Sequence, residues 1–413
     1  MFTSTLAQGL APDLLDRFQR YVRVDTQSSA DTGDEPSTPG QLDLGRLLVG
    51  ELHEIGLEDA AMDDGGFVFA TLPGDGPVVG LLAHVDTTPE VPGAGVEPIV
   101  HRAYDGGVIE LPKGGTVLDP AAMPVLGGKT GHDIVTSSGD TLLGADDKAG
   151  VAEIMAAVAH LAAHPELPRP TLRVGFTPDE EIGLGATRFD LERFGAACAY
   201  TLDGSQPGEL QDESFSAIGL TVTFTGVDVH PGWATGKLVN ATRLAGRFLA
   251  ALPPELTPEA TEDREGFVHA YEVDATTARA VIKMIARDFD EALLEQHVAL
   301  VRRTAEEVSP AAEVHATRQY SNMREHLDAV PEVVERAAEA IRAEGLEVVR
   351  VPIRGGTDGS ILSSRGLPTP NLFTGGHEYH SVREWASVHD MASAAAVVVR
   401  LAGLWAEEPP APA

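Results

Sequence analysis

Five short segments of the chain place acidic residues or histidines directly after apolar runs. Carboxylate oxygens and imidazole nitrogens are ligands that divalent cations take in proteins, and a pair of ions needs about six such donors, one of them shared. Because ligands collect at the carboxyl ends of strands in an open α/β sheet, separate segments can meet at one edge. The segments predict a two-metal site with the ligands His84, Asp146, Glu181, Asp203 and His380.

The HVD segment contains both a candidate ligand and a residue that could orient it. Residues 84 and 86 lie two apart, so they point to the same side of an extended chain. Asp86 can therefore approach the imidazole of His84 and fix its tautomer for metal binding. A plain turn at the end of a strand is the alternative interpretation of this triplet.

The GADDKAG segment places two acids and Lys148 at the start of an apolar helix. Capping of the helix N-terminus explains one acid but not two. A carboxylate that bridges two cations holds them about 3.5–4 Å apart, and we assign this role to Asp146. Asp147 is then expected to cap the helix or to support the loop.

The PDEE segment has two adjacent carboxylates after the apolar run TLRVGF. On most loops such a pair would be surface charge, but here the two side chains can divide two tasks. Glu181 is predicted to bind a metal, and Glu180 to take a proton from the attacking water as general base.

Composition excludes several classes of protein. The chain has 63 Asp and Glu against 30 Lys and Arg, a formal charge of −33, which repels nucleic acids and anionic membranes. The lone cysteine, Cys198, excludes an internal disulfide and is expected in the core. The first 23 residues lack the features of a signal peptide, and no run of about 18 apolar residues occurs, so a cytoplasmic protein is expected.

The candidate ligands require an α/β framework. At 413 residues the chain is longer than one core usually supports, which favours two domains. Strand-like runs alternate with helices up to residue 202, a rhythm typical of a largely parallel sheet. From about Phe215 the order becomes βαββαβ, which predicts an inserted α+β unit. The expected helices are 10–22, 41–55, 149–163, 239–252, 291–308, 331–343 and 392–406, and the expected strands are 78–83, 171–176, 199–202, 218–224, 266–272, 280–286, 313–318, 346–351 and 370–373.

These segments, taken in order and spacing, resemble the peptidase T family of zinc-dependent tripeptide aminopeptidases. More loosely the chain is similar to carboxypeptidases and aminoacylases of the same two-domain build. The resemblance covers nearly the whole chain and is carried by LAHVDTTP, LLGADDKAGVAEIM, FTPDEEIGLGA, YTLDG, VHPG, GKLVNA, EGF, ARDFD, NMRE, PIRGGTDG and NLFTGG.

The resemblance implies two zinc ions per subunit, for which cobalt or manganese can substitute. One ion would be held by His84, Asp146 and Asp203, and the other by Asp146, Glu181 and His380. Glu180 would be the general base. Residues 1–212 and 325–413 would form the di-zinc catalytic domain, and residues 213–324 an inserted lid, which in relatives often builds homodimers.

Three further residues are expected at the substrate. The resemblance implies that His230 helps to polarise the scissile carbonyl, whereas a turn histidine is the alternative. Arg287 and Arg354 could grip the free carboxylate of a short peptide, and structural ion pairs are the alternative for both. The segment GGHEYHSVREW also contains His377; the register favours His380 as ligand, since it follows a tyrosine and precedes Glu384 by four residues.

The expected activity is hydrolysis of unblocked tripeptides at the first peptide bond. A dipeptidase, a carboxypeptidase or an aminoacylase would use the same metal apparatus, and the need for a free amino terminus separates these from an aminopeptidase. A non-catalytic metal-binding protein is the alternative from another class, but it would be expected to lack Glu180 or a ligand. Short peptides are the expected partners.

Overall fold

The computed structural model describes residues 1–407, and the chain forms two compact units. The first contains Met1–Asp212, Glu325–Val351 and the described residues from Thr357 onward, and the second contains Glu213–Arg324 and Pro352–Gly356. The sequence had assigned all of 325–413 to the catalytic part. The short segment Pro352–Gly356 instead belongs to the second unit, because the backbone amides of Phe215 and Ile353 donate to the carbonyls of Ile353 and Glu213.

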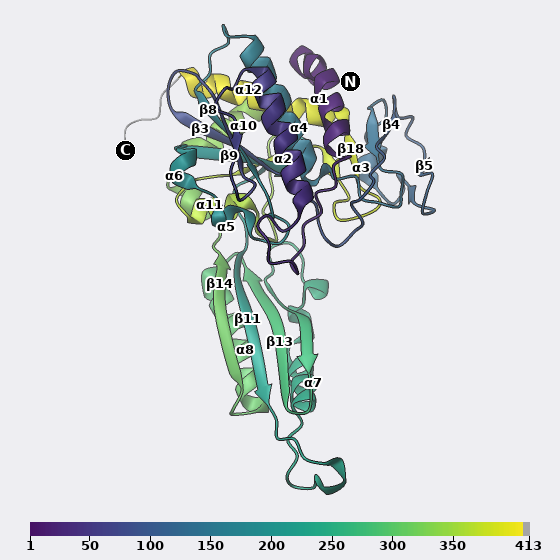
Figure 1. Cartoon of the computed structure of the whole chain (residues 1–413), viewed down its shortest axis with the longest axis vertical. Coiled ribbons are helices and arrows are strands. Elements are labelled where there is room, and N and C mark those ends of the chain that lie inside the picture. Colours follow the sequence, from purple (N-terminus) through teal and green to yellow (C-terminus); the bar gives the residue numbers. More distant parts are fainter. Residues whose placement is uncertain (408–413) are drawn as a thin grey trace. The chain divides into compact units, whose positions relative to one another are not determined.

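The first unit is built on an eight-stranded sheet (Figure 1). In spatial order its strands are β1 (Ala61–Met62), β2 (Val68–Leu72), β8 (Thr171–Thr177), β3 (Val78–His84), β9 (Cys198–Gly204), β16 (Asn371–Phe373), β10 (Glu209–Gln211) and β15 (Val349–Arg350). The central strands β8, β3, β9 and β16 are parallel. Antiparallel pairs join β1 to β2, β2 to β8 and β16 to β10, whereas β10 and β15 are parallel. The predicted, mainly parallel α/β sheet is confirmed.

Long helices pack beside this sheet. They are α1 (Thr5–Tyr21), α2 (Pro39–Ile55), α4 (Ala145–Ala163), α10 (Pro331–Ala343) and α12 (Val388–Glu407). Helix α4 contacts β3 and β9 and also packs against α1 and α12. By length and composition α12 is the one described helix that could cross a membrane, over Val388–Ala406. However, 83% of that window is buried inside the protein, as in a core helix.

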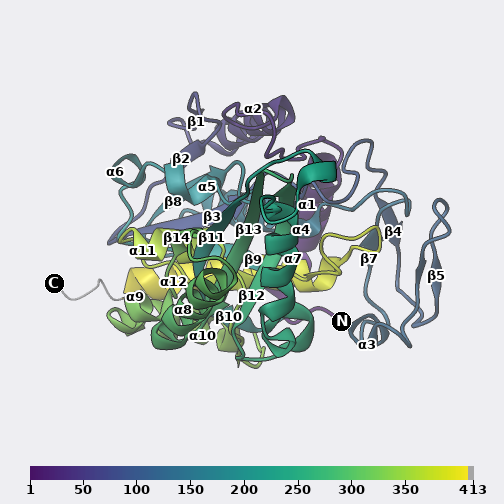
Figure 2. The ribbon, with the colours of Figure 1, turned by 90° about the horizontal axis from the view of Figure 1, so that it is seen from below.

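Short helices and small sheets complete the first unit. The helices are α3 (Pro124–Gly127), α5 (Gly185–Arg188), α6 (Leu191–Phe194), α9 (Arg324–Asp328, whose first residue falls in the second unit) and α11 (Asp358–Ser364). A four-stranded sheet joins β17 (Gly376–His377), β18 (Trp385–Ser387), β7 (Ile134–Thr136) and β4 (Ile99–His101), and a two-stranded sheet joins β5 (Ile109–Glu110) and β6 (Val117–Leu118). Figure 2 shows α3, β4, β5 and β7 gathered at one side of this unit.

The second unit has the predicted order βαββαβ. Its strands are β11 (Ser216–Thr225), β12 (Phe267–Ala275), β13 (Arg279–Asp288) and β14 (Glu313–Tyr320), and its helices are α7 (Ala241–Ala251) and α8 (Glu291–Val308). Three short 3-10 turns, η1 (Pro231–Trp233), η2 (Pro254–Leu256) and η3 (Pro258–Ala260), lie between β11 and β12. The sheet order is β12-β13-β11-β14, all antiparallel.

An apolar core holds this second unit together. Alternate residues of β11, among them Leu220, Val222 and Phe224, are buried with Phe248 of α7 and Leu294 of α8. This alternation is the period-two pattern of a strand that buries one face. Side chains of Asn240 and Asp290 cap α7 and α8 by accepting backbone N–H groups at each helix start.

Candidate metal centre

All five predicted ligands meet at the carboxyl edge of the central parallel strands. His84 ends β3, Asp203 lies near the end of the adjacent strand β9, and Glu181 follows β8. The imidazole Nε2 of His84 lies 2.9 Å from Asp146 Oδ1 and 3.8 Å from Asp203 Oδ1. The imidazole Nε2 of His380 lies 3.5 Å from Asp146 Oδ2 and 2.9 Å from Glu181 Oε2. The two oxygens of Asp146 therefore face two different histidines, as a bridging carboxylate requires.

The neighbouring acid, Asp147, is tied to the backbone. Its Oδ2 accepts the amide N–H of His84 at 3.1 Å, and its Oδ1 accepts that of Gly150 at 3.2 Å. Asp146 and Asp147 have non-helical backbone angles, so regular helix starts after them and Asp147 caps it. Ligand atoms of His84, Asp147 and Asp203 also come within 4.8 Å of one another, as do those of His84, Asp146 and Glu181. The two backbone bonds to Asp147 favour Asp146 as the ligand.

Asp86 contacts more of the site than the sequence suggested. Its Oδ1 lies 3.3 Å from Nδ1 of His84, which is the predicted orienting contact. The same carboxylate accepts the amide N–H groups of Glu180 at 3.0 Å and Glu181 at 3.1 Å. Asp86 thus joins the β3 ligand to the backbone of the two glutamates.

Two buried acids support the site without having been predicted as site residues. Glu384 accepts the amides of Leu143 and Gly144, both at 2.7 Å, and that of Asp146 at 3.0 Å. Burial raises the pKa of Glu384 to about 7. Asp358 accepts the hydroxyl of Thr177 at 2.5 Å and the amide of Ala186 at 3.0 Å. Together they fix the loops that carry Asp146, Glu180 and Glu181.

The acids of the cluster are crowded and poor in cations. Burial, followed by the charges of neighbouring carboxylates, raises the pKa of Glu180 and of Asp203 well above the ordinary range. Burial acts on Asp146 in the same direction, but hydrogen bonds from His380 and His84 outweigh it and lower the Asp146 pKa. Hydrogen bonds to Asp146 and Glu181 raise the pKa of His380 to about 11.

This donor set fits divalent cations. Buried carboxylates that repel one another are costly unless a cation or a hydrogen-bond partner compensates them. Oε1 of Glu181 is buried and has no hydrogen-bond partner among the described residues. Three carboxylates and two imidazoles are the ligand types that zinc takes.

The second candidate histidine, His377, lies apart from these contacts. Its Nδ1 is 3.1 Å from the hydroxyl oxygen of Ser205, and its ring packs on Trp385 at 4.2 Å between centroids. Burial lowers the His377 pKa to about 3. The geometry therefore favours His380, the residue that the register had selected.

The three predicted substrate residues all belong to the second unit, and their roles stay predictions. His230 is exposed, accepts the amide of Gly232 at 3.1 Å and packs against Trp233. The guanidinium of Arg287 lies over the ring of Phe267 at 5.9 Å, and its Nε has no hydrogen-bond partner among the described residues.

Arg354 is engaged within the second unit. Its guanidinium donates to the carbonyls of Asp263 at 2.8 Å, Glu265 at 3.0 Å and Thr261 at 3.2 Å. It also stacks over Phe215 and Phe267. These contacts hold the loop before β12 through backbone carbonyls, and not through the structural ion pair that was the alternative for Arg354.

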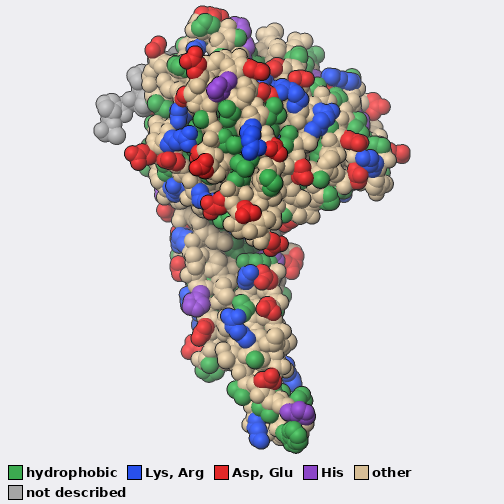
Figure 3. All heavy atoms as spheres, in the orientation of Figure 1, with side chains coloured by type: hydrophobic (Ala, Val, Ile, Leu, Met, Phe, Trp, Pro, Cys, Tyr) green, Lys and Arg blue, Asp and Glu red, His purple; other side chains and the backbone are tan. Residues whose placement is uncertain are grey.

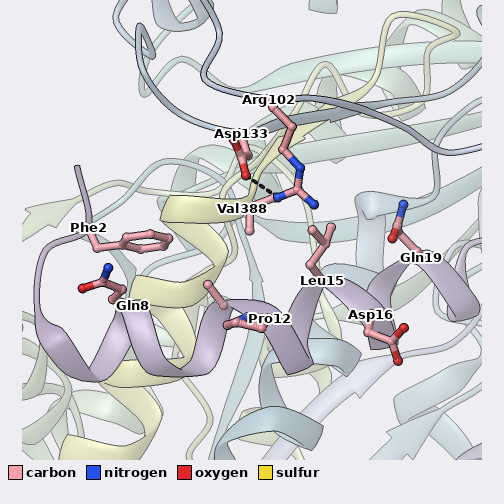
Figure 4. Close-up of a pocket in the computed structure, with 10 residues that line it drawn as sticks. Phe2, Gln8, Pro12, Leu15, Asp16, Gln19, Arg102, Asp133 and Val388 are labelled. Atoms are coloured by element: carbon pink, nitrogen blue, oxygen red, sulfur yellow. Dashed lines mark hydrogen bonds and ion pairs between the residues drawn. The ribbon is translucent and has the colours of Figure 1, made fainter.

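A surface groove of about 510 Å³ lies elsewhere in the first unit, along α1 (Figure 4). Its lining includes Phe2, Pro12, Leu15 and the ion pair of Arg102 with Asp133, and it shares no residue with the acid cluster. On the face drawn in Figure 3, acidic side chains are interspersed with basic ones, and the described residues form no continuous basic patch there.

Residues 143–403 match the family model described as Peptidase family M20/M25/M40. The chain therefore belongs to this peptidase family and is a metallopeptidase. Within the family, it is 47% identical over 404 residues to peptidase T of Shouchella clausii, which covers 96% of this chain and 98% of the relative. It is 44% identical to peptidase T of Vibrio parahaemolyticus, with coverage of 96% and 99%.

Solved structures share the fold. An aminopeptidase from Bacillus cereus has a TM-score of 0.72 at 23% identity, covering 95% of this chain and 98% of its own. A tripeptidase from Staphylococcus aureus has a TM-score of 0.75 at 21% identity, with coverage of 96% and 99%. A Bacillus subtilis protein described as a dinuclear metal-binding M20 peptidase has a TM-score of 0.62 at 16% identity, with coverage of 97% and 99%.

Proposed function

We propose that the protein is a tripeptide aminopeptidase that removes the N-terminal residue from unblocked tripeptides with the help of two zinc ions. Relatives named peptidase T, 44–47% identical over nearly the whole chain, support the substrate class. The observation that carries the proposal is the position of Asp146, whose two carboxylate oxygens face His84 and His380 separately.

The proposed ligands divide into two sets that share Asp146. His84 and Asp203 complete one set, and Glu181 and His380 complete the other. When bound, a pair of divalent cations polarises a peptide carbonyl and lowers the pKa of water to near neutrality. The negative charge of Asp146, Glu181 and Asp203 would hold the ions, and the backbone bonds to Asp86 and Glu384 would hold the ligands in place.

Glu180 is the proposed general base. Its carboxylate accepts a proton from the attacking water and then returns it to the nitrogen of the leaving amine. The amide of Glu180 is bound to Asp86, so the base and the His84 ligand are held by one carboxylate. His230, as a group that polarises the carbonyl, and Arg287, as a grip on the peptide carboxylate, remain part of the proposal.

Hydrolysis of three related peptides tests the substrate class. The zinc-loaded protein is given Ala-Ala-Ala, N-acetyl-Ala-Ala-Ala and Ala-Ala, with a chelated sample as control. Release of only the N-terminal residue from the free tripeptide, lost on chelation, supports the proposal. Cleavage of the blocked peptide or the dipeptide would move the protein to an aminoacylase, carboxypeptidase or dipeptidase activity, and no cleavage of any would favour a non-catalytic protein.

A cytoplasmic location and a homodimer also remain proposals. The lone buried Cys198 agrees with a reducing compartment. Cell fractionation tests the location, and sedimentation of the purified protein tests the oligomeric state.

A further inference from the structure

The loop that carries both glutamates turns on an unusual residue, Asp179. Its backbone φ angle is +58°, in the left-handed region that side chains other than glycine seldom occupy. A residue held there is strained, and its surroundings must offset that strain. The Asp179 side chain is fully buried. The contacts of its side chain and backbone therefore have to account for an aspartate at this position.

The Asp179 carboxylate is surrounded by hydrogen-bond donors. The amide N–H of Ser37 donates to both of its oxygens, at 3.1 and 3.0 Å, and the hydroxyl of Ser37 donates at 2.5 Å. Nε2 of Gln41 donates at 2.8 Å, and the guanidinium of Arg188 donates at 3.1 Å. These bonds suit a carboxylate, which accepts all of them.

The backbone of Asp179 is held just as firmly. Its N–H donates to Oε1 of Gln41 at 3.0 Å, so one amide side chain grips both the backbone and the carboxylate of Asp179. The carbonyl of Asp179 accepts the amides of Leu184 at 2.9 Å and Gly185 at 3.0 Å, which closes the loop.

Two of these partners, Ser37 and Gln41, come from the start of helix α2, whereas Arg188 belongs to α5. Ser37 lies two residues before α2, and Gln41 lies in its first turn. The helix N-cap, Thr38, makes no side-chain cap bond, and a carboxylate near the first turn is favoured by the helix dipole. The α2 terminus thus holds a residue that directly precedes the proposed base.

We propose that Asp179 is a positioning residue for Glu180, and that Ser37 and Gln41 act through it. The left-handed turn at Asp179 sets the direction in which the chain enters Glu180 and Glu181, whose amides are then bound by Asp86. Residues at the start of α2 thus hold the residue before the glutamate pair, and Asp86 holds the amides of the pair itself. This inference rests on the proposed role of Glu180 in hydrolysis.

The test compares kcat, KM and amide hydrogen exchange in the zinc-loaded full chain. Asp179→Asn keeps the shape of the side chain but replaces one carboxylate oxygen, an acceptor, by an NH2 group that faces other hydrogen-bond donors. Displacement of the base by about 1 Å is expected to lower kcat about 10–100-fold, with KM changed less than about twofold. The amides of Leu184 and Gly185 should exchange at least about tenfold faster.

Rescue distinguishes positioning from general stability. Gln41→Glu in the Asp179→Asn chain offers an acceptor to the new amide nitrogen, so part of the lost kcat should return. Gln41→Glu alone places two carboxylates together and should lower kcat. Ser37→Ala removes the hydroxyl bond to Asp179, together with the bonds that this oxygen accepts from Ser29 and Gln41, and keeps the amide bonds of Ser37 to Asp179. It gives a milder version of the same loss if Asp179→Asn does not fold.

Glu344→Gln is the matched control. Glu344 is also a buried carboxylate of the first unit, with bonds from Thr3, Ser4 and Arg400, but it holds the start of α1. Its loss should lower stability and leave both kcat and exchange at 184–185 unchanged.

The proposal is overturned if the kcat of Asp179→Asn stays within about twofold of wild type, or falls no more than that of Glu344→Gln. It is also overturned if the amides of residues 184–185 exchange at the wild-type rate in Asp179→Asn. A loss that Gln41→Glu does not reverse overturns the link to α2. If the wild-type chain hydrolyses no tripeptide, the proposed function fails. Hydrogen exchange at residues 184–185 then decides the positioning role alone.

Discussion

The acid cluster at the candidate metal centre differs from the second unit in how its buried acids are compensated. In the first unit, Glu180 and Asp203 lie with other carboxylates at one edge of the sheet, and burial together with those neighbours raises their pKa. In the second unit, Glu213 has a largely buried side chain but receives two hydrogen bonds from Arg264, at 2.6 and 2.7 Å, and lies 2.9 Å from Arg324. Burial would raise the Glu213 pKa, yet these arginines lower it.

This difference in compensation shows where the protein's own side chains supply too few positive charges for the buried carboxylates. The second unit neutralises its buried acids itself, and Asp288 likewise pairs with His297 at 2.8 Å. The acid cluster of the first unit has only His84 and His380 for at least four carboxylates, Asp146, Glu180, Glu181 and Asp203. Such a surplus is expected where bound metal ions complete the charge balance.

The largest expected effect comes from metal removal. A chelator should abolish turnover and destabilise the first unit, because a ligand at about 1,000 times its Kd contributes about 4 kcal/mol to the folded state. Addition of zinc should restore both, and the same chelator saturated with zinc serves as the control. Peptide hydrolysis and thermal unfolding are the measurements. Full turnover in a metal-free sample would contradict the claim that bound metal ions compensate the acid cluster of the first unit.

Next in size is loss of the proposed base. Glu180→Gln should lower kcat by about 10²–10⁴-fold, the usual contribution of a general base. The metal content should stay at the wild-type value, since Glu180 is not a proposed ligand. Asp203→Asn, which removes a proposed ligand, should lower both. Metal analysis beside kinetics separates the two cases, and Glu192→Gln, an exposed acid of α6, is the control.

The sequence identified the cluster because each ligand follows its own apolar run. His84 ends β3, Glu181 follows β8, Asp203 lies near the end of β9, and the HVD, DDK and PDEE patterns are local. The two long helices 291–308 and 331–343 were also predicted with the observed bounds, since their apolar spacing and Asp and Pro start signals are local. Local sequence patterns were sufficient to predict an element or a ligand where a single segment contains all the residues of the pattern.

The supporting contacts could not be predicted in this way. Glu384 binds the amide of Leu143 across 241 positions, and Asp179 binds Ser37 across 142, so no window of sequence contains either pair. The small sheet of β17, β18, β7 and β4 was missed because its strands have only two or three residues. The join of Pro352–Gly356 to the second unit depends on pairing with residues near 214, which is equally nonlocal.

A smaller effect is expected in the second unit. Arg264→Leu leaves Glu213 with Arg324 and should cost about 1–2 kcal/mol of unfolding free energy, as for one charged hydrogen-bonded pair near the surface. Since the folded pKa of Glu213 is lowered, its stabilisation is present above the unfolded pKa of about 4.5 and is lost as pH falls. The variant should therefore differ from wild type most at neutral pH, measured by denaturant unfolding, with metal content unchanged. An equal difference at pH 3 and pH 7 would contradict the pairing.

The smallest effect concerns Glu153 in α4, an acid of the first unit for which the described residues provide no cation partner. Both of its oxygens are buried without hydrogen bonds among the described residues, and burial raises its pKa well above the ordinary range. Because the folded state keeps a proton that the unfolded state loses, Glu153 weakens stability as pH rises above about 4.5. Glu153→Met should stabilise the protein by about 1 kcal/mol at neutral pH, and less at pH 4. A destabilised Met variant would indicate a partner for Glu153.

Anomalous diffraction at the zinc edge tests the central claim most directly. The account predicts two peaks in the first unit, one beside His84, Asp146 and Asp203 and the other beside Asp146, Glu181 and His380. Both peaks should lie against the two oxygens of Asp146. A single peak bound by Asp147 in place of Asp146, or no peak in zinc-soaked crystals, would contradict the claim that these crowded acids form a two-metal centre.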